Sequence, residues 1–257
     1  AAVGLQPGTY QFKVSSEGGG GNLEFGWNSS VSEAYSVVST DDPAASPDPN
    51  TWAVVPDLEN LAATPPLNQH SVARPAEPLR FYALIVGPVL PLFSDDFEAG
   101  PGNWTSAIND PDGNSQWELG TPAGSTGPLA GADDSANAWC TNIGDYGADS
   151  DIALRSPAID LSGAGGAELT FDAFRDADGF GDTAVVRFLR AADQVQLGAE
   201  TSLGMNTLDE DYVTQSIAVV PEALGERVLL EFNFVSDGSA DAFSGLSIDN
   251  VRVEVTN

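Results

Sequence analysis

Hydrophobic and polar residues alternate over short stretches along the chain, and these stretches predict β-strands. In the first third the clearest are TYQFKVS (residues 9–15), LEFGW (23–27), AYSVVST (34–40) and LRFYALIV (79–86). A two-residue period places alternate side chains on opposite faces of a strand. Segments rich in Gly, Pro, Asp and Ser, such as EGGGGN and DDPAASPDPN, lie between them and predict turns.

The alternation continues from Phe93 onward, with closer spacing. Eight segments predict strands there: QWELG, NAWCTN, IALRSPAIDL, AELTFDAF, TAVVRFLR, YVTQSIAV, RVLLEFNFVS and LSIDNVRVEV. No 3.6-residue period persists, and only PEALGER is expected to add a helical turn. Residues 58–78 are rich in proline and show no clear period, so they predict no strand.

These patterns predict an all-β protein of two tandem antiparallel β-sandwiches. GPVLP resembles a short, stiff linker, which places the domains at residues 1–90 and 91–257. A chain of 257 residues is long enough for two cores, and its 27 glycines and 17 prolines suit short strands. No apolar run approaches 18 residues, so membrane insertion is not expected.

The chain is strongly acidic. It has 38 Asp and Glu against 9 Lys and Arg, for a formal net charge of −29. The part before Ser94 has 9 acidic and 3 basic residues (−6), and the rest has 29 and 6 (−23). This field repels nucleic acid and anionic membranes and favours cations. The single Cys140 excludes an internal disulfide and fits an exported bacterial protein or a cytosolic one.

The segment SDDFE opens the second part with three carboxylates. A strand from Phe93 to Phe97 would bury both phenylalanines, while Asp96 and Glu98 point the other way. Carboxylates this close repel one another unless a cation or a hydrogen-bond donor pairs with them. Oxygen-only ligands suit calcium, and the alternative is a solvated acidic strand end.

An ordered set of segments in the second part resembles a known family. The set is FSDDFEAG with NW, NAWCTNIGDYGADSDIALRSPAIDLSG, AELTFDAFRDADGFGDTAVVRF, LLEFNFVSDGS and LSIDNVRVEV, from about Phe93 to Val255. It resembles the MAM-like jelly-roll modules of bacterial exported proteins, including those attached to immune-inhibitor-A-type metallopeptidases. The resemblance implies a two-sheet jelly roll, often with bound calcium, and an extracellular or cell-surface location.

The same resemblance implies the ligands of a structural calcium ion. Carrying the family site over gives Asp96, Glu98 and Asp249, with Asn137 contributing its carbonyl, because the first and last strands of a jelly roll lie near each other. Asn250 stands where the family often has a second Asp. In the first part, LEFGWNSSVSEAYSVVSTDDP, TWAVVPDL and LRFYALI are similar to small fibronectin-type-III-like modules of exported bacterial proteins.

Two acidic segments invite an EF-hand interpretation and fail it. Counted from Asp176, position 5 is Phe180 and position 12 is Arg187, where an oxygen ligand and a bidentate Glu belong. DPDGNSQWELGT also fails, with Ser115 at position 6 and Thr121 at position 12. Both segments predict turns whose Asp and Asn side chains cap their own backbone.

The sequence gives little support for catalysis, and we expect no enzyme. His70 is the one histidine, so HExxH is absent, and neither GxSxG nor GxxxxGK[ST] occurs. Cys140 lies mid-strand and is expected to be a buried, inert thiol. The five tryptophans are expected in the core. Trp104, beside Pro and Gly, is the best candidate for an exposed ring that stacks on a sugar.

The first strand suggests self-association. TYQFKVS places Tyr10, Phe12 and Val14 on one apolar face, and a glycine run tethers it. Such a strand can complete its own sheet or a neighbour's edge, and head-to-tail exchange gives filaments. We therefore expect a non-catalytic structural or adhesive module that contacts itself or other cell-surface proteins. The alternative is an accessory carbohydrate- or substrate-binding module of a secreted hydrolase or metallopeptidase.

Overall fold

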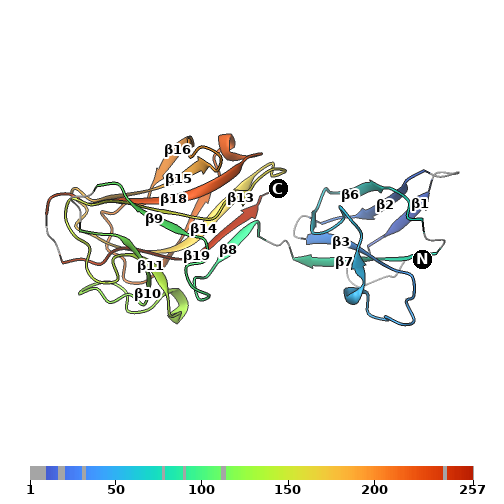
Figure 1. Cartoon of the computed structure of the whole chain (residues 1–257), viewed down its shortest axis with the longest axis horizontal. Coiled ribbons are helices and arrows are strands. Elements are labelled where there is room, and N and C mark those ends of the chain that lie inside the picture. Colours follow the sequence, from blue (N-terminus) through green and yellow to red (C-terminus); the bar gives the residue numbers. More distant parts are fainter. Residues whose placement is uncertain are drawn as a thin grey trace. The chain divides into compact units, whose positions relative to one another are not determined.

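The computed structural model describes residues 10–16, 21–30, 33–76, 79–88, 91–110, 114–239 and 242–256. The chain divides into two compact units, unit 1 (residues 1–90) and unit 2 (residues 91–257). Strands dominate both units (Figure 1), and every described strand pairing is antiparallel. The fold is all-β, as the alternation predicted. The described part of the chain contains no helix that is long and apolar enough to span a bilayer.

Unit 1 is a small sandwich of two antiparallel sheets. One sheet has the order β1-β2-β6, formed by Lys13–Ser16, Leu23–Asn28 and Leu67–Val72. In the other, β3 pairs with three strands; the members are β3 (Glu33–Thr40), β4 (Ala53–Val54), β5 (Leu61–Ala62) and β7 (Phe81–Pro88). A 3-10 turn, η1 (Pro49–Thr51), precedes β4. Side chains of β2 and β3, among them Trp27 and Tyr35, form the core.

β6 lies in the segment for which the sequence predicted no strand. It pairs with β2 along its whole length. Its inward side chain is the fully buried Asn68, which accepts a hydrogen bond from Thr64 N (2.7 Å) and donates one to the Ala62 carbonyl (2.8 Å). The inward position of β6 is thus occupied by a hydrogen-bonded amide side chain instead of an apolar one. The strand therefore shows no hydrophobic alternation, and the hydrophobic pattern does not predict it.

Unit 2 is a larger sandwich of two six-stranded sheets (Figure 1). The β19 sheet has the order β10-β11-β19-β14-β17, with β8 also on β19; its strands are β8 (Phe93–Asp95), β10 (Trp117–Gly120), β11 (Ala138–Thr141), β14 (Ala167–Asp176), β17 (Val213–Ala218) and β19 (Gly245–Val255). The β18 sheet has the order β16-β15-β18-β12-β9, with β13 also on β18; its strands are β9 (Thr105–Ile108), β12 (Asp151–Arg155), β13 (Ile159–Asp160), β15 (Thr183–Arg190), β16 (Gln196–Ser202) and β18 (Arg227–Val235).

The chain crosses repeatedly between the two sheets of unit 2, which is the connectivity of a jelly roll. Two 3-10 turns, η2 (Ala132–Asp134) and η3 (Pro221–Ala223), lie in the connections. η3 is the helical turn that PEALGER predicted.

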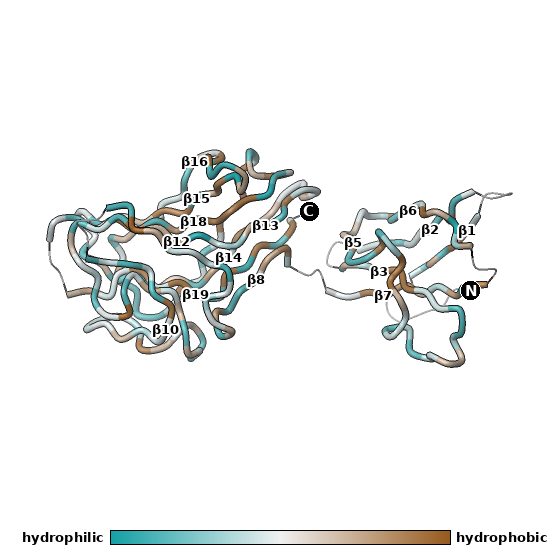
Figure 2. Tube along the Cα trace, in the orientation of Figure 1, coloured by the Kyte–Doolittle hydropathy of each residue, from teal (hydrophilic) through white to brown (hydrophobic). Residues whose placement is uncertain are grey.

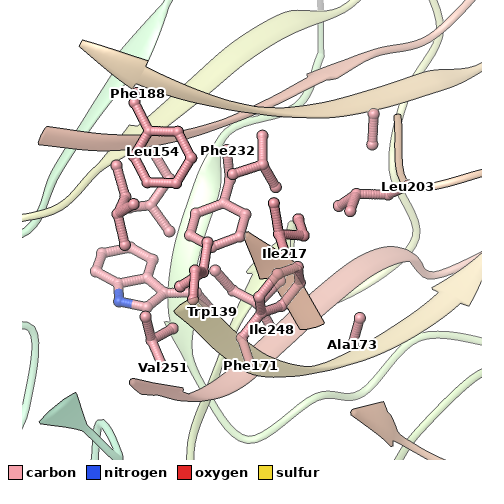
Figure 3. Close-up of a cluster of buried hydrophobic side chains, with 14 of the residues drawn as sticks. Trp139, Leu154, Phe171, Ala173, Phe188, Leu203, Ile217, Phe232, Ile248 and Val251 are labelled. Atoms are coloured by element: carbon pink, nitrogen blue, oxygen red, sulfur yellow. The ribbon is translucent and has the colours of Figure 1, made fainter. Parts of the chain in front are cut away.

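The core of unit 2 lies between the two sheets (Figure 3). Side chains from both sheets meet there, including Phe171, Ile217, Ile248, Leu154, Phe188 and Phe232. The rings of Phe171 and Phe232 meet edge to face with their centroids 5.0 Å apart. Along the trace, hydrophobic stretches coincide with these long strands and polar residues gather in the connections (Figure 2). The alternation in the sequence therefore places the core correctly.

The outer face of the β19 sheet is also buried in part. Cys140, Ser247 and Asp249 alternate with the inward residues Trp139 and Ile248, yet each of the three is at most 1% exposed. The connection between β10 and β11, residues 121–137, lies over this face and is called the covering loop below. It is the structure around which the candidate site is built.

Candidate functional site

The first half of the covering loop is held by two carboxylates from elsewhere in unit 2. Asp145 accepts hydrogen bonds from both the N–H and the hydroxyl of Ser125, at 2.7 Å each. Asp176 accepts one from the Thr126 hydroxyl (2.6 Å), and also from the N–H and hydroxyl of Ser244 (2.9 Å each). Hydrogen bonds to a charged acceptor are stronger than neutral ones, so these contacts restrain the loop.

The second half is held by two more carboxylates. Asp249 Oδ2 accepts from Ala132 N and from the Ser135 hydroxyl, at 2.9 Å each. Glu98 Oε1 accepts from Asn137 N at 2.8 Å. Glu98 follows β8 and Asp249 lies in β19, and these strands pair, so the first and last strands of unit 2 meet as expected. The structure thus joins Glu98 directly to Asn137 and anchors the same loop on Asp249.

Asp249 is a carboxylate with no access to water. Burial raises its pKa, three hydrogen-bond donors work against that rise, and the nearby Glu98 charge adds to it. The third donor is Asn250 N, 2.7 Å from Oδ1. The β14–β19 register shifts at this point, where Asn250 adopts a φ of 48°. A β-bulge of this kind redirects side chains and is frequent beside functional sites.

The surroundings of Gly131 test whether these residues fit a cation. A Cβ at this position would lie 2.0 Å from Ser135 Oγ, 2.5 Å from the Asn137 carbonyl oxygen and 2.7 Å from Asp249 Oδ2, so only glycine fits. Hydroxyl, carbonyl and carboxylate oxygens therefore converge beside Glu98, and this is the donor chemistry that calcium accepts. Among the residues described, no three Asp, Glu, His or Cys side chains converge on a metal position, so a cation here needs the uncharged oxygens as well.

Asp96 differs from the expectation because β8 ends early. The strand stops at Asp95, and Phe97 adopts a φ of 59° while its ring is fully buried. This left-handed residue breaks the alternation, so Asp96 and Glu98 do not face away together from a continuous strand. The exposed Asp96 accepts a hydrogen bond from Glu98 N (3.2 Å). No hydrogen bond described joins it to Asn137 or Asp249.

Trp104 is not the exposed sugar-stacking ring that its sequence context suggested. It is 5% exposed, its ring meets Phe97 edge to face, and its Nε1 donates to Asp95 Oδ2 at 2.9 Å. Asp95 also accepts from Phe97 N at 2.9 Å. Asp95, the one carboxylate of SDDFE that is not among the predicted calcium ligands, is thus a hydrogen-bond acceptor with a structural role.

The one histidine and the one cysteine of the chain contact other side chains within their units. His70 stacks on Trp27 in unit 1, with ring centroids 5.4 Å apart, and burial lowers its pKa. Cys140 is 1% exposed, and burial raises the pKa of its thiol to about 11. The prediction of a buried thiol at Cys140 is confirmed.

The segment from Asp176 to Asp182 forms cross-links between loops. Asp178 caps its own turn through Phe180 N (3.1 Å), as predicted. Asp182 instead accepts from the Tyr146 hydroxyl and from Asp237 N (2.9 Å), which joins it to two other connections. In the second EF-hand-like segment, residues 111–113 lie outside the described residues.

A cavity of about 600 Å³ lies beside the covering loop on the outer face of the β19 sheet. We call it the acidic groove. The loop contributes residues 127–134, strand β14 contributes Asp172 and Phe174, and residues 210–212 with Thr214 come from the approach to β17 and the strand itself. The sequence pattern does not indicate this site, because three separate segments form it only after β14 pairs with β17.

The acidic groove has a fixed aromatic wall. Tyr212 donates its hydroxyl hydrogen to the Ala130 carbonyl (3.2 Å) and meets Phe174 edge to face, with centroids 5.7 Å apart. Asp172 accepts from the Thr214 hydroxyl (2.5 Å) and from Asn250 Nδ2 (2.9 Å). The groove therefore combines positioned rings with carboxylates, which suits ligand binding.

Of the predicted assembly strand, only the end from Lys13 onward pairs within its own unit, as β1, whereas Tyr10 and Phe12 precede that strand. β1 lies at the edge of its sheet, beside β2. Tyr10 and Phe12 pack against the unit 1 core, and Phe12 stacks on Phe25 with centroids 6.1 Å apart. Val14 is 40% exposed and contributes nothing to that core, so the apolar face is shorter than predicted. Of the proposed glycine tether, Gly18 to Gly21, residues 18–20 lie outside the described residues.

No protein-family model and no curated protein matches the chain. Two cleaved adhesin domains of Lys-gingipain from Porphyromonas gingivalis are similar to part of the chain, with 21% and 19% identity and TM-scores of 0.45 and 0.43; each match covers 64% of this chain, and 99% and 98% of the domain. A family 11 carbohydrate-binding module from Clostridium thermocellum, in complex with a mixed-linked tetrasaccharide, has 13% identity and a TM-score of 0.40, over 63% of this chain and 94% of the module. These likenesses assign neither family nor activity.

Proposed function

We propose that the chain is a non-catalytic extracellular module that binds another molecule through unit 2, in an adhesive or structural role. The observation that carries the proposal is the covering loop. Four carboxylates hold it on the β19 sheet, and it forms one side of the acidic groove. A loop that is already ordered loses little conformational entropy on binding, which is the property of a preformed recognition surface.

The roles of His70 and Cys140 support a non-catalytic module. A general base needs a side chain that can reach its substrate, and a nucleophilic thiol needs to be ionised. His70 is stacked on Trp27 in unit 1, and Cys140 is buried under the covering loop with a raised pKa. Both side chains therefore serve packing.

We further propose that calcium stabilises unit 2 at Glu98, Asp249 and the Asn137 carbonyl, with Asp96 at its edge. The supporting observation is the convergence of oxygens beside Gly131. A bound cation would offset the repulsion between Glu98 and the buried Asp249. It would strengthen the anchor of the covering loop without entering any reaction.

An accessory carbohydrate-binding module is the second candidate. The observation that favours it is the half-buried Tyr212 ring beside the carboxylates of the acidic groove, because sugars stack on rings and donate hydroxyls to carboxylates. This candidate assigns the same groove to a different ligand.

Immobilised full chain tests the proposed function. We expect saturable binding to cell-surface glycans or proteins and no turnover of any of them. Turnover of a peptide or polysaccharide by the purified chain, lost on a single substitution, would overturn the non-catalytic assignment. Saturable binding that is unchanged when Asp133→Asn, Asp134→Asn and Leu129→Ser are combined would show that the groove is not the binding surface.

A further inference from the structure

We infer that the acidic groove binds a basic peptide segment of a protein partner, through Lys or Arg side chains. The inference rests on the proposed function and specifies the partner. Five carboxylates line the groove and no Lys or Arg does; they are Asp133, Asp134, Asp172, Glu210 and Asp211. Three other cavities differ, because those at Arg80, at Lys13 and at Arg190 with Arg227 each include a basic side chain.

Three of these carboxylates have no partner among the described residues. Asp133, Asp134 and Glu210 accept no hydrogen bond and form no ion pair there, whereas the adjacent Asp209 is held by Arg175 through Nε (2.8 Å) and Nη2 (2.9 Å). An arginine of the same unit thus forms an ion pair one residue away from Glu210, whereas these three groove carboxylates form none among the described residues. Their charge is left for a cationic ligand.

The apolar side of the groove suits the stems of basic side chains. Leu129 is 75% exposed on the covering loop, and the Tyr212 and Phe174 rings lie in the same cavity. The methylene stems of Lys and Arg pack along apolar surface while the charged head reaches a carboxylate. A cation over the face of Tyr212 would gain further attraction.

A peptide explains the arrangement better than a metal ion. The unpaired carboxylates come from two separate segments, the covering loop and the approach to β17, and no three carboxylates among the described residues converge on one point. Several cationic groups spaced along one backbone match separated carboxylates, whereas one ion does not. A neutral glycan would leave the five negative charges unbalanced.

The test uses full chain and a fluorescein-labelled peptide with three lysines separated by Ser and Gly. A matched peptide carries glutamine at the three positions. We expect the lysine peptide to bind saturably at physiological ionic strength. The affinity of the glutamine peptide should be lower by a factor of about ten or more, and a factor of ten is equivalent to ~1.4 kcal/mol. Added salt should weaken binding of the lysine peptide, because charge pairs supply the difference in affinity between the two peptides.

Two groove variants and one control separate a local site from the overall charge. Asp133→Asn with Asp134→Asn should weaken lysine-peptide binding about tenfold, and Leu129→Ser should weaken it by a smaller factor. The control, Asp160→Asn with Glu222→Gln, removes two exposed carboxylates outside the groove and should leave binding unchanged. Melting curves of all variants show whether each chain is folded.

Equal losses in the groove pair and the control pair would overturn the inference, because net charge would then explain the binding. Equal affinity for the two peptides would also overturn it. A third outcome is saturable glycan binding that the Asp133→Asn with Asp134→Asn variant loses, with no preference for the lysine peptide. That outcome would leave the proposed function in place, with a glycan as the ligand instead of a basic peptide. Absence of saturable binding to either class would remove both.

Discussion

At the residue scale, Asp249 determines how the covering loop is attached. Its carboxylate is fully buried, so its negative charge lacks water and is supported by three hydrogen-bond donors. The charged form of Asp249 makes folding of unit 2 less favourable at neutral pH, because burial removes water from the charge and the nearby Glu98 charge repels it. A buried carboxylate with these neighbours should leave a measurable trace in the pH dependence of stability.

We predict that the stability of the wild type relative to Asp249→Asn rises as pH falls. Burial places the pKa of Asp249 in the folded chain above its ordinary value of 3.8, so folding favours proton uptake. The gain is fully present below pH 3.8 and is lost as pH rises through the folded pKa. Urea unfolding in chelator at several pH values measures the difference. A difference that stays constant or moves the other way would contradict the burial of this carboxylate.

Cys140 gives a second prediction at this scale. Its thiol is 1% exposed with a pKa of about 11, and thiol reagents attack the thiolate. In the native chain at pH 8 we expect labelling only as fast as unfolding allows, and immediate labelling in denaturant. Rapid labelling of the folded chain, with an unchanged melting curve, would show that the covering loop opens.

At the element scale, the alternation located most strands but not the ones whose inner faces are polar or short. β2, β3, β7, β14, β15 and β18 follow the predicted segments, since their buried faces are apolar. β6 was missed because Asn68 occupies its inner face, and the end of β8 was misplaced because Phe97 turns left-handed. A local pattern reports neither a satisfied amide nor a backbone reversal.

The candidate site was partly accessible from the sequence. The resemblance brought Glu98, Asn137 and Asp249 together, and the structure places them around one loop. It did not indicate Ser135 or Gly131, whose importance depends on close approach in space. Nothing local could indicate the acidic groove, because its residues come from segments far apart in the chain.

The segment that leads into β1 gives a prediction at the element scale, with Phe12 just before the strand and Val14 within it. Phe12→Ala should lower the stability of unit 1 by about 2 kcal/mol, because the ring is half-buried on Phe25, and Val14→Ala at an exposed position should change little. Calorimetry resolves the effect, and unit 2 should be unaffected. Equal effects of the two substitutions would contradict the observed packing.

Strand exchange through β1 remains a prediction, although β1 pairs with β2 of its own unit in the structure. The full chain should form head-to-tail assemblies at high concentration with calcium and salt, which screen its −29 charge, and deletion of residues 1–16 should stop them. Light scattering that reports a monomer under those conditions would exclude the exchange.

At the scale of the whole molecule, the acidity has two structural uses. Many carboxylates of unit 2 act as acceptors that join loops, as Asp145, Asp176 and Asp182 do. Others line the acidic groove, where Asp133, Asp134 and Glu210 have no partner among the described residues, and we propose that they bind a cationic ligand. This distribution of charge is the basis of both proposals, that calcium stabilises unit 2 and that a cationic partner binds it.

We predict that calcium stabilises unit 2. At 100 times its dissociation constant it should add roughly 2.7 kcal/mol, so chelator should lower the melting temperature. Asp96→Asn with Glu98→Gln should abolish the calcium effect. Asp160→Asn with Glu222→Gln is the matched control, because it also removes two carboxylates, and it should preserve the effect. A melting curve unchanged in excess chelator would refute the site.

Hydrogen–deuterium exchange of the covering loop in the full chain tests whether this loop is a preformed binding surface. The amides of Ala132 and Asn137 donate to Asp249 and Glu98, and that of Ser125 donates to Asp145. We predict that all three exchange slowly in the native chain, and that Asp249→Ala accelerates exchange at Ala132 more than at Ser125. Exchange at the rate of an unstructured loop in the wild-type chain would contradict a preformed binding surface.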